Sequence, residues 1–180
     1  MATTPALFVS LEQEWSRLAW TTDAAVVTGW AAREPLLLDC VTAVGVVGRC
    51  RRRGEVDDTN AVVGALLRLA RGDDHATRTL LQAVLPGLAA RVRRVANRSV
   101  GHRPLPGCDS VEDLGGEMVA TALERISRLA GTSPSWPAAA IVGGTWRAVR
   151  TNAGSALRCE QLRLPLESAQ SLPAPAELSS

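Results

Sequence analysis

The 180-residue sequence predicts an all-α protein, a multi-helix bundle with an N-terminal helical extension and a disordered C-terminal tail. Apolar residues recur every three or four positions in several segments, which is the spacing of one helix face. Residues that cap helices stand where these segments begin, and Gly or Pro stands where they end. The final SLPAPAELSS has low complexity and lacks this spacing. We expect the extension over residues 1–56, a helical domain over 57–152 and a flexible tail over 153–180.

The N-terminal extension is expected to contain two helices. Leu7, Leu11, Trp15 and Leu18 recur at spacings of four and three, which predicts a helix from residue 7 to residue 20. The stretch 21–33 contains Thr and Gly and reads as a connection. The Val-rich run 36–50 is compatible with a buried helix or a strand, and its helical neighbours favour a helix.

Four further helices are expected between residues 57 and 152. Two aspartates open the first at 57–58, and another pair opens the second at 73–74, where negative charge suits the helix dipole. Pro86 lies inside the second helix and removes a backbone hydrogen bond there, so we expect a kink. Ser110 or Asp109 caps the third helix, and Pro137 opens the fourth. Their shared periodicity predicts a core of Leu81, Val84, Leu88, Val92, Leu114, Met118, Ile126, Ile141 and Val149.

Composition excludes several classes of protein. The formal net charge is only +2, and every basic residue is Arg, a bias typical of GC-rich genomes and therefore weak evidence for phosphate binding. The four cysteines match no zinc spacing and the two histidines lie far apart, so we expect no metal and no cofactor. The sequence shows no secretory signal and no apolar run of about 20 residues. We expect a cytoplasmic chain without a membrane partner.

An acidic stripe is predicted on the helix over 110–129. Asp113, Glu117 and Glu124 fall on one face, away from the apolar positions of the same segment. Like charges four residues apart repel by a few tenths of a kcal/mol. The helix either presents this stripe to a basic partner or carries a solvated face, and spacing alone leaves both open.

A second candidate surface combines tryptophan with arginine. Trp146, Arg147 and Arg150 lie opposite the buried face of the last helix, and Trp136 enters from the preceding turn. An exposed Trp between arginines is a stacking platform beside phosphate-binding groups. The alternative is that Trp146 packs against the N-terminal helices.

The stretch from His75 to Cys108 forms a basic block. It has no acidic residue and contains the six arginines Arg78, Arg91, Arg93, Arg94, Arg98 and Arg103. Such a block can follow a nucleic-acid backbone, with Arg91, Arg94 and Arg98 as the candidate contacts, or it can be a solvated basic surface. No nucleophile elbow, phosphate-binding loop or clustered His accompanies it, so we expect a binding protein rather than an enzyme.

Several of these segments resemble region two of bacterial RNA polymerase sigma factors, particularly the extracytoplasmic-function type. The run LARGDDHA at 69–76 resembles the start of that domain, and the Pro-containing segment 80–94 resembles the helix that follows. Val111-Glu112-Asp113-Leu114-x-x-Glu117 is similar to a Glu-Asp-Leu signature of the family. Residues 136–150 stand where the family carries its promoter-melting helix. The resemblance covers about half of the chain.

The resemblance implies partners for both surfaces. Asp113 and Glu117, with Glu124 in the same stripe, would contact the β′ clamp helices of core RNA polymerase, while Trp146, Arg147 and Arg150 would approach promoter DNA. Gly116 replaces the usual Gln, and no second helix-turn-helix domain is recognisable. We therefore expect a sigma-like transcription regulator, with residues 1–56 open to another protein. The alternative is a helical protein-interaction module that keeps the fold and binds neither.

Overall fold

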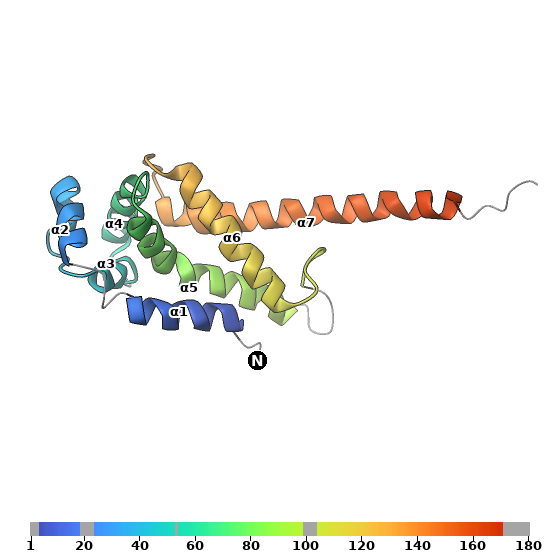
Figure 1. Cartoon of the computed structure of the whole chain (residues 1–180), viewed down its shortest axis with the longest axis horizontal. Helices are drawn as coiled ribbons and strands as arrows, with labels where there is room; N and C mark the ends of the chain where they lie inside the picture. Colours follow the sequence, from blue (N-terminus) through green and yellow to red (C-terminus); the bar gives the residue numbers. More distant parts are fainter. Residues whose placement is uncertain (1–3, 19–23, 53, 99–103, 171–180) are drawn as a thin grey trace, which may run out of the picture.

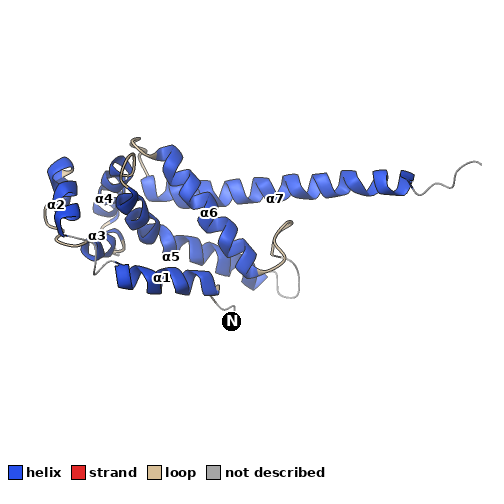
Figure 2. Ribbon diagram, viewed as in Figure 1, coloured by secondary structure: helices blue, strands red, loops and turns tan. Residues whose placement is uncertain are grey.

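The computed structural model describes residues 4–18, 24–52, 54–98 and 104–170, with side chains placed up to Ser155. These residues form an all-α fold, as predicted, without any strand (Figure 1, Figure 2). The elements in chain order are α1 (Ala6–Leu18), α2 (Ala24–Arg33), the 3-10 helix η1 (Pro35–Leu37), α3 (Ala43–Cys50), α4 (Val56–Leu69), α5 (Asp74–Arg98), α6 (Val111–Leu129) and α7 (Pro137–Gln170). None of the described helices is long and apolar enough to cross a membrane.

The predicted core is confirmed. Every residue expected there is buried, from Leu81 in α5 to Val149 in α7. The same cluster also takes Phe8 and Trp15 from α1 and the fully buried Trp30 from α2. The N-terminal helices therefore pack into the core of the other helices, with α1 against both α5 and α6.

Two expectations for the N-terminal segment are wrong in detail. Residues 24–33 form α2 rather than a connection, because burial of Val27 and Trp30 outweighs the helix-weakening Gly29. The helix expected over 36–50 begins only at Ala43, where the Thr42 hydroxyl accepts a hydrogen bond of 3.1 Å from the Gly45 amide. The preceding residues form η1 and a turn.

α5 continues as one helix through Pro86. Proline has no amide hydrogen, so the carbonyl of Gln82, four residues earlier, lacks its helical donor. The guanidinium of Arg51 donates to that carbonyl at 2.5 Å and to the Glu12 carboxylate at 2.9 Å. A side chain from the end of α3 thus satisfies the carbonyl that Pro86 leaves unpaired.

The stretch expected to be a flexible tail, 153–180, starts within α7 in the structure. α7 continues to Gln170 and extends past the other helices (Figure 1). Periodicity is a signal of packing, and a helix that leaves the bundle does not need it. The segment contains helix-forming residues such as Ala156, Leu157 and Gln161. Residues 171–180 lie outside the described residues.

Candidate macromolecule-binding surfaces

Helices α5 and α7 meet at Gly87 and Val142. A Cβ atom added to Gly87 would lie 3.2 Å from a methyl carbon of Val142, so the side of α5 that carries Gly87 faces α7. The absence of a side chain at Gly87 lets the two helices approach this closely. From this contact both helices run in the same direction and diverge (Figure 1).

The face of α5 that carries Gly87 is apolar before this contact and basic after it. On its N-terminal side the face carries Ala76, Leu80 and Ala83, all buried. On its C-terminal side, four, seven and eleven residues after Gly87, it carries Arg91, Arg94 and Arg98. These spacings keep the three arginines on one helix face. Arg91 is half-buried, whereas Arg94 and Arg98 are exposed. We call these three residues the arginine stripe.

The face of α7 that meets α5 carries Trp146 and Arg150, four and eight residues after Val142. The guanidinium carbon of Arg150 lies 6.0 Å from the centre of the Trp146 ring, at the outer range of a cation–π contact. Trp146 is half-buried and packs against the core, while Arg150 and the neighbouring Arg147 are exposed. The Trp146 ring therefore packs partly against the protein core, and the guanidinium of Arg150 lies over the ring.

The arginine stripe and the Trp146–Arg150 pair begin from the same helix contact. At a rise of about 1.5 Å per residue, Arg91 and Trp146 each lie about 6 Å beyond it along their own helices. Arg150 follows at about 12 Å, between the levels of Arg94 and Arg98. These residues, which the sequence predicts as a binding surface, therefore lie on one face of α5 and one face of α7. The two faces diverge from the Gly87–Val142 contact.

Trp136 does not belong to this arrangement. It lies before the start of α7 and is 58% exposed. Together with Asn60 and Arg68 of α4 it lines a separate pocket of about 450 Å³. Trp136 precedes α7, whereas Trp146 lies ten residues further along the chain, inside that helix.

The predicted acidic residues of α6 each have a partner within the chain. Asp113 forms a capping box with Ser110, in which the Asp113 carboxylate accepts from the Ser110 amide at 2.9 Å and the Ser110 hydroxyl accepts from the Asp113 amide at 3.0 Å. The Thr121 hydroxyl donates to Glu117 at 3.4 Å, and Arg128 donates to Glu124 at 3.3 Å. Asp113 therefore helps to cap the start of α6.

Asp113 and Glu117 also line a pocket of about 680 Å³ between the start of α6, the preceding loop and α7. Cys108 is buried beside it, and burial together with the nearby carboxylates of Glu117, Asp113 and Asp109 raises the pKa of its thiol. The Cys108 thiol therefore stays protonated, and the negative charge at this pocket comes from the carboxylates.

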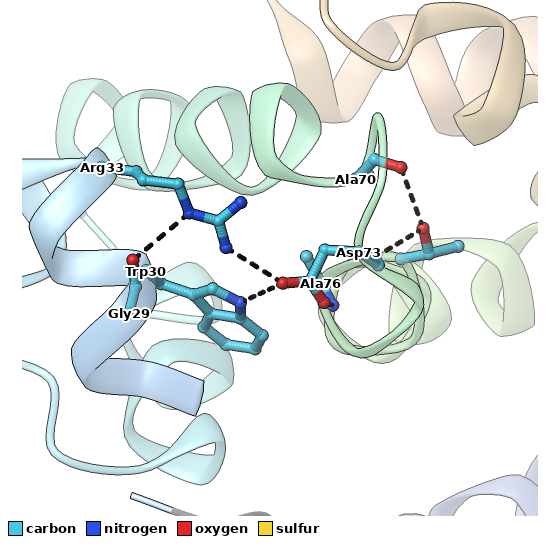
Figure 3. Close-up of polar contacts among 7 residues, drawn as sticks. Gly29, Trp30, Arg33, Ala70, Asp73 and Ala76 are labelled. Atoms are coloured by element: carbon cyan, nitrogen blue, oxygen red, sulfur yellow. Dashed lines mark hydrogen bonds and ion pairs between the residues drawn. The ribbon is translucent and has the colours of Figure 1, made fainter. Parts of the chain in front are cut away.

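Asp73 opens α5, as the sequence predicts, and it also makes contacts with α2 that the sequence did not reveal (Figure 3). One carboxylate oxygen accepts from the Ala76 amide at 3.0 Å and so caps α5. The other accepts from the Trp30 indole at 2.7 Å and from Arg33 at 3.1 Å. Burial acts to raise the pKa of Asp73, but these hydrogen bonds outweigh it and hold the pKa below the usual aspartate value. Asp73 thereby attaches α2 to the start of α5.

Within the described part of the chain, no group of three or more His, Cys, Asp or Glu side chains could hold a metal ion. The arrangement offers charged and aromatic surfaces suited to macromolecules. No protein-family model matches the chain, and comparisons with curated proteins and with solved structures likewise find no match.

Proposed function

We propose that this chain is a sigma-like transcription regulator that binds nucleic acid along α5 and α7 and core RNA polymerase along α6. The observation that carries the proposal is the common origin of the arginine stripe and the Trp146–Arg150 pair at the Gly87–Val142 contact. It joins a row of cations to an aromatic ring that is held in place by the core.

Each part has a defined role in binding a single strand. Arg91, Arg94 and Arg98 would neutralise successive phosphates and release counterions, which makes affinity depend on salt. Trp146 would stack on an unpaired base, an interaction open to every base because each has a π face. Arg147 and Arg150 would add phosphate contacts from α7. A role in transcription would place the chain in the cytoplasm.

The acidic stripe supports the polymerase part of the proposal. The Glu124–Arg128 pair is exposed on both sides, with side chains 66% and 72% exposed, and such pairs contribute little to stability. Basic side chains of a coiled coil on the partner could therefore replace Arg128 as the partner of Glu124 at a small cost in free energy. Glu117 and Glu124 are the residues to test, because Asp113 belongs to the capping box at the start of α6.

A protein-interaction module remains the second candidate. The half-burial of Trp146 against the core favours it, since that packing alone gives the ring a reason to be present. Under this alternative the arginine stripe is a solvated surface, and the partner is another protein rather than DNA.

Co-purification with core RNA polymerase tests the polymerase contact. The double variant Glu117→Arg/Glu124→Arg should lose binding while keeping the helical circular-dichroism spectrum of the parent. Asp39→Arg/Asp57→Arg makes the same change in charge at exposed positions off the stripe, and it should bind as the parent does. Equal loss in both variants, or a parent that does not bind core polymerase, would show that the polymerase contact is wrong.

A further inference from the structure

Arg125 of α6 lies against the backbone of α7 at Gly144. A Cβ atom added to Gly144 would lie 2.7 Å from Nε of Arg125 and 3.0 Å from its guanidinium carbon. The absence of a side chain at Gly144 therefore leaves a recess in the surface of α7, and the guanidinium of Arg125 fills it. Gly144 follows Val142 by two residues, so this recess lies on a different side of α7 from the contact with α5.

The guanidinium of Arg125 has no counter-charge among the described residues. It is half-buried, and its Nε is shielded from solvent without a hydrogen-bond partner. The α6 positions three and four residues away carry no carboxylate, and residues 137–155 of α7 include no Asp or Glu. Arg49, which is also half-buried, donates to both carboxylate oxygens of Asp58. A half-buried cation without a partner calls for an explanation, and an anion from a binding partner would provide one.

The terminal nitrogens of Arg125 remain open to a ligand. Of the three guanidinium nitrogens, Nε alone is both fully shielded and unpaired. The residue makes no hydrogen bond or ion pair within the described part of the chain, so its two terminal nitrogens keep access to solvent. The recess at Gly144 holds the group in one orientation. A guanidinium held in this way can donate from both terminal nitrogens to one phosphate, and preorganisation lowers the cost of binding.

Arg125 extends the basic surface of α7 to its side nearest α6. Residues three or four apart are neighbours on the surface of a helix. Arg147 follows Gly144 by three residues, and Arg150 follows Arg147 by three. Both arginines are exposed, and Trp146, four residues before Arg150, lies on the side that faces α5. A continuous row of basic groups therefore crosses the exposed surface of α7 between α5 and α6.

We propose that Arg125 contacts a phosphate of the bound strand, so that the strand crosses α7 from the arginine stripe to α6. This inference rests on the proposed binding of nucleic acid. Gly144 is a positioning residue, because it provides the recess for the guanidinium. Glu117 and Glu124 are turned by about 80–100° around α6 from Arg125, so the strand and the polymerase would meet different sides of that helix.

A first pair of full-length variants tests the charge, with fluorescence anisotropy of a labelled single-stranded oligonucleotide as the measurement. Arg125→Gln is compared with Arg17→Gln, which removes an exposed charge from α1. Arg125→Gln should bind about tenfold more weakly at low salt, the effect of one hydrogen bond to a charged group. The slope of log affinity against log salt should fall in magnitude by about 0.7, for one phosphate of a single strand. Arg17→Gln should change neither quantity.

A second pair of variants keeps every charge and changes only its position. Gly144→Ala places a methyl group where Nε of Arg125 lies and displaces the guanidinium, whereas Gly143→Ala adds the same methyl group in open space. Gly144→Ala should weaken binding to the oligonucleotide, and Gly143→Ala should bind as the parent does. Both should keep the helical circular-dichroism spectrum, because the displaced group is the end of a flexible side chain.

NMR of the parent locates the contact. The Nε–Hε signal of Arg125, assigned by its absence from Arg125→Gln, should shift when the oligonucleotide is added. An unshifted signal, equal affinities of Arg125→Gln and Arg17→Gln, or equal affinities of the two glycine variants would overturn this inference and leave the arginine stripe in place. A parent without affinity for DNA at low salt would overturn both the inference and the proposed binding of nucleic acid.

Discussion

Arg51 donates a hydrogen bond of 2.5 Å to the carbonyl of Gln82, the carbonyl that Pro86 leaves without a helical donor. The same guanidinium holds Glu12 of α1 at 2.9 Å. One side chain at the end of α3 therefore compensates for a proline in α5 and connects three helices. The helix can pass through Pro86 because its lost hydrogen bond is replaced from outside.

The first prediction is a coupling between Arg51 and Pro86. Arg51→Ala should cost roughly 1–2 kcal/mol of unfolding free energy, because a part-buried carbonyl loses its donor. Pro86→Ala returns an amide hydrogen to the helix, so Arg51→Ala should cost less in that background. Urea denaturation of the four chains in the cycle measures the coupling. Strict additivity would show that Arg51 acts independently of the carbonyl that Pro86 leaves unpaired.

The second prediction concerns stability in acid. The folded-state pKa of Asp73 lies below its unfolded value, so the unfolded chain takes up the proton first. The stabilisation from Asp73 is therefore present above the unfolded pKa of about 3.9 and is lost as the pH falls through the folded pKa. Asp73→Asn should make the acid-side decrease in melting temperature shallower.

A matched variant separates this effect from the general change in charge. Asp39→Asn removes an exposed carboxylate from a loop and should give the melting curve of the parent across the same pH series. Tryptophan fluorescence adds a local readout, because Trp30 loses its carboxylate partner only in Asp73→Asn. An unchanged acid slope in Asp73→Asn would contradict the assigned role of Asp73.

The third prediction compares Gly131, just after the end of α6, with Gly143 inside α7. Gly131 has φ +79°, and a Cβ there would lie 2.7 Å from Cδ of Arg71. Gly131→Ala should therefore cost about 1–2 kcal/mol. Gly143 lies inside α7 with nothing within 4 Å of an added Cβ, so Gly143→Ala should stabilise by roughly 0.5–1 kcal/mol. Thermal melts that show the same sign for both substitutions would disagree with these backbone conformations.

The fourth prediction addresses stacking by Trp146. Because the ring also packs against the core, Trp146→Leu is a better test than Trp146→Ala, since Leu keeps an apolar group at the position. The variant should lose roughly 1–3 kcal/mol of affinity for single-stranded DNA, with little change in salt dependence. Arg147→Ala/Arg150→Ala should instead weaken the salt dependence. An affinity unchanged in Trp146→Leu would favour the protein-interaction module.

The helical fold and its core follow closely from sequence, because α5, α6 and the first part of α7 carry strong periodicity and clear caps. Leu114, Met118 and Ile126 repeat at helical spacing, and all are buried. The position before an apolar run marks Ser110 and Asp109 as candidate caps, and the structure has Ser110 in that role. These signals are local, so a single sequence contains them.

The features that escaped prediction depend on contacts between distant residues. Trp30 and Asp73 are 43 positions apart, and Arg51 and Gln82 are 31 apart, so no local pattern marks either pair. α2 forms because tertiary burial of Trp30 outweighs weak propensity. The sequence marked Arg91, Arg94 and Arg98 as candidate DNA contacts within the basic block. Their relation to Trp146 needed the Gly87–Val142 contact, which fixes how α5 and α7 meet.

Nucleic-acid binding by the arginine stripe is tested most directly by the salt dependence of binding to single-stranded DNA. Arg91→Ala/Arg94→Ala/Arg98→Ala is compared with Arg17→Ala/Arg52→Ala/Arg128→Ala, which removes three exposed arginines elsewhere. Both variants lose the same formal charge, and the control also gives up the exposed ion pairs of Arg52 with Glu55 and of Arg128 with Glu124. Fluorescence anisotropy of a labelled oligonucleotide at several salt concentrations gives the slope of log affinity against log salt.

The stripe variant should lower the magnitude of that slope by about 2, from about 0.7 for each of three lost phosphate contacts on a single strand. The matched variant should leave the slope close to that of the parent. Equal reductions in both variants, or a parent without affinity for DNA at low salt, would contradict nucleic-acid binding by this surface.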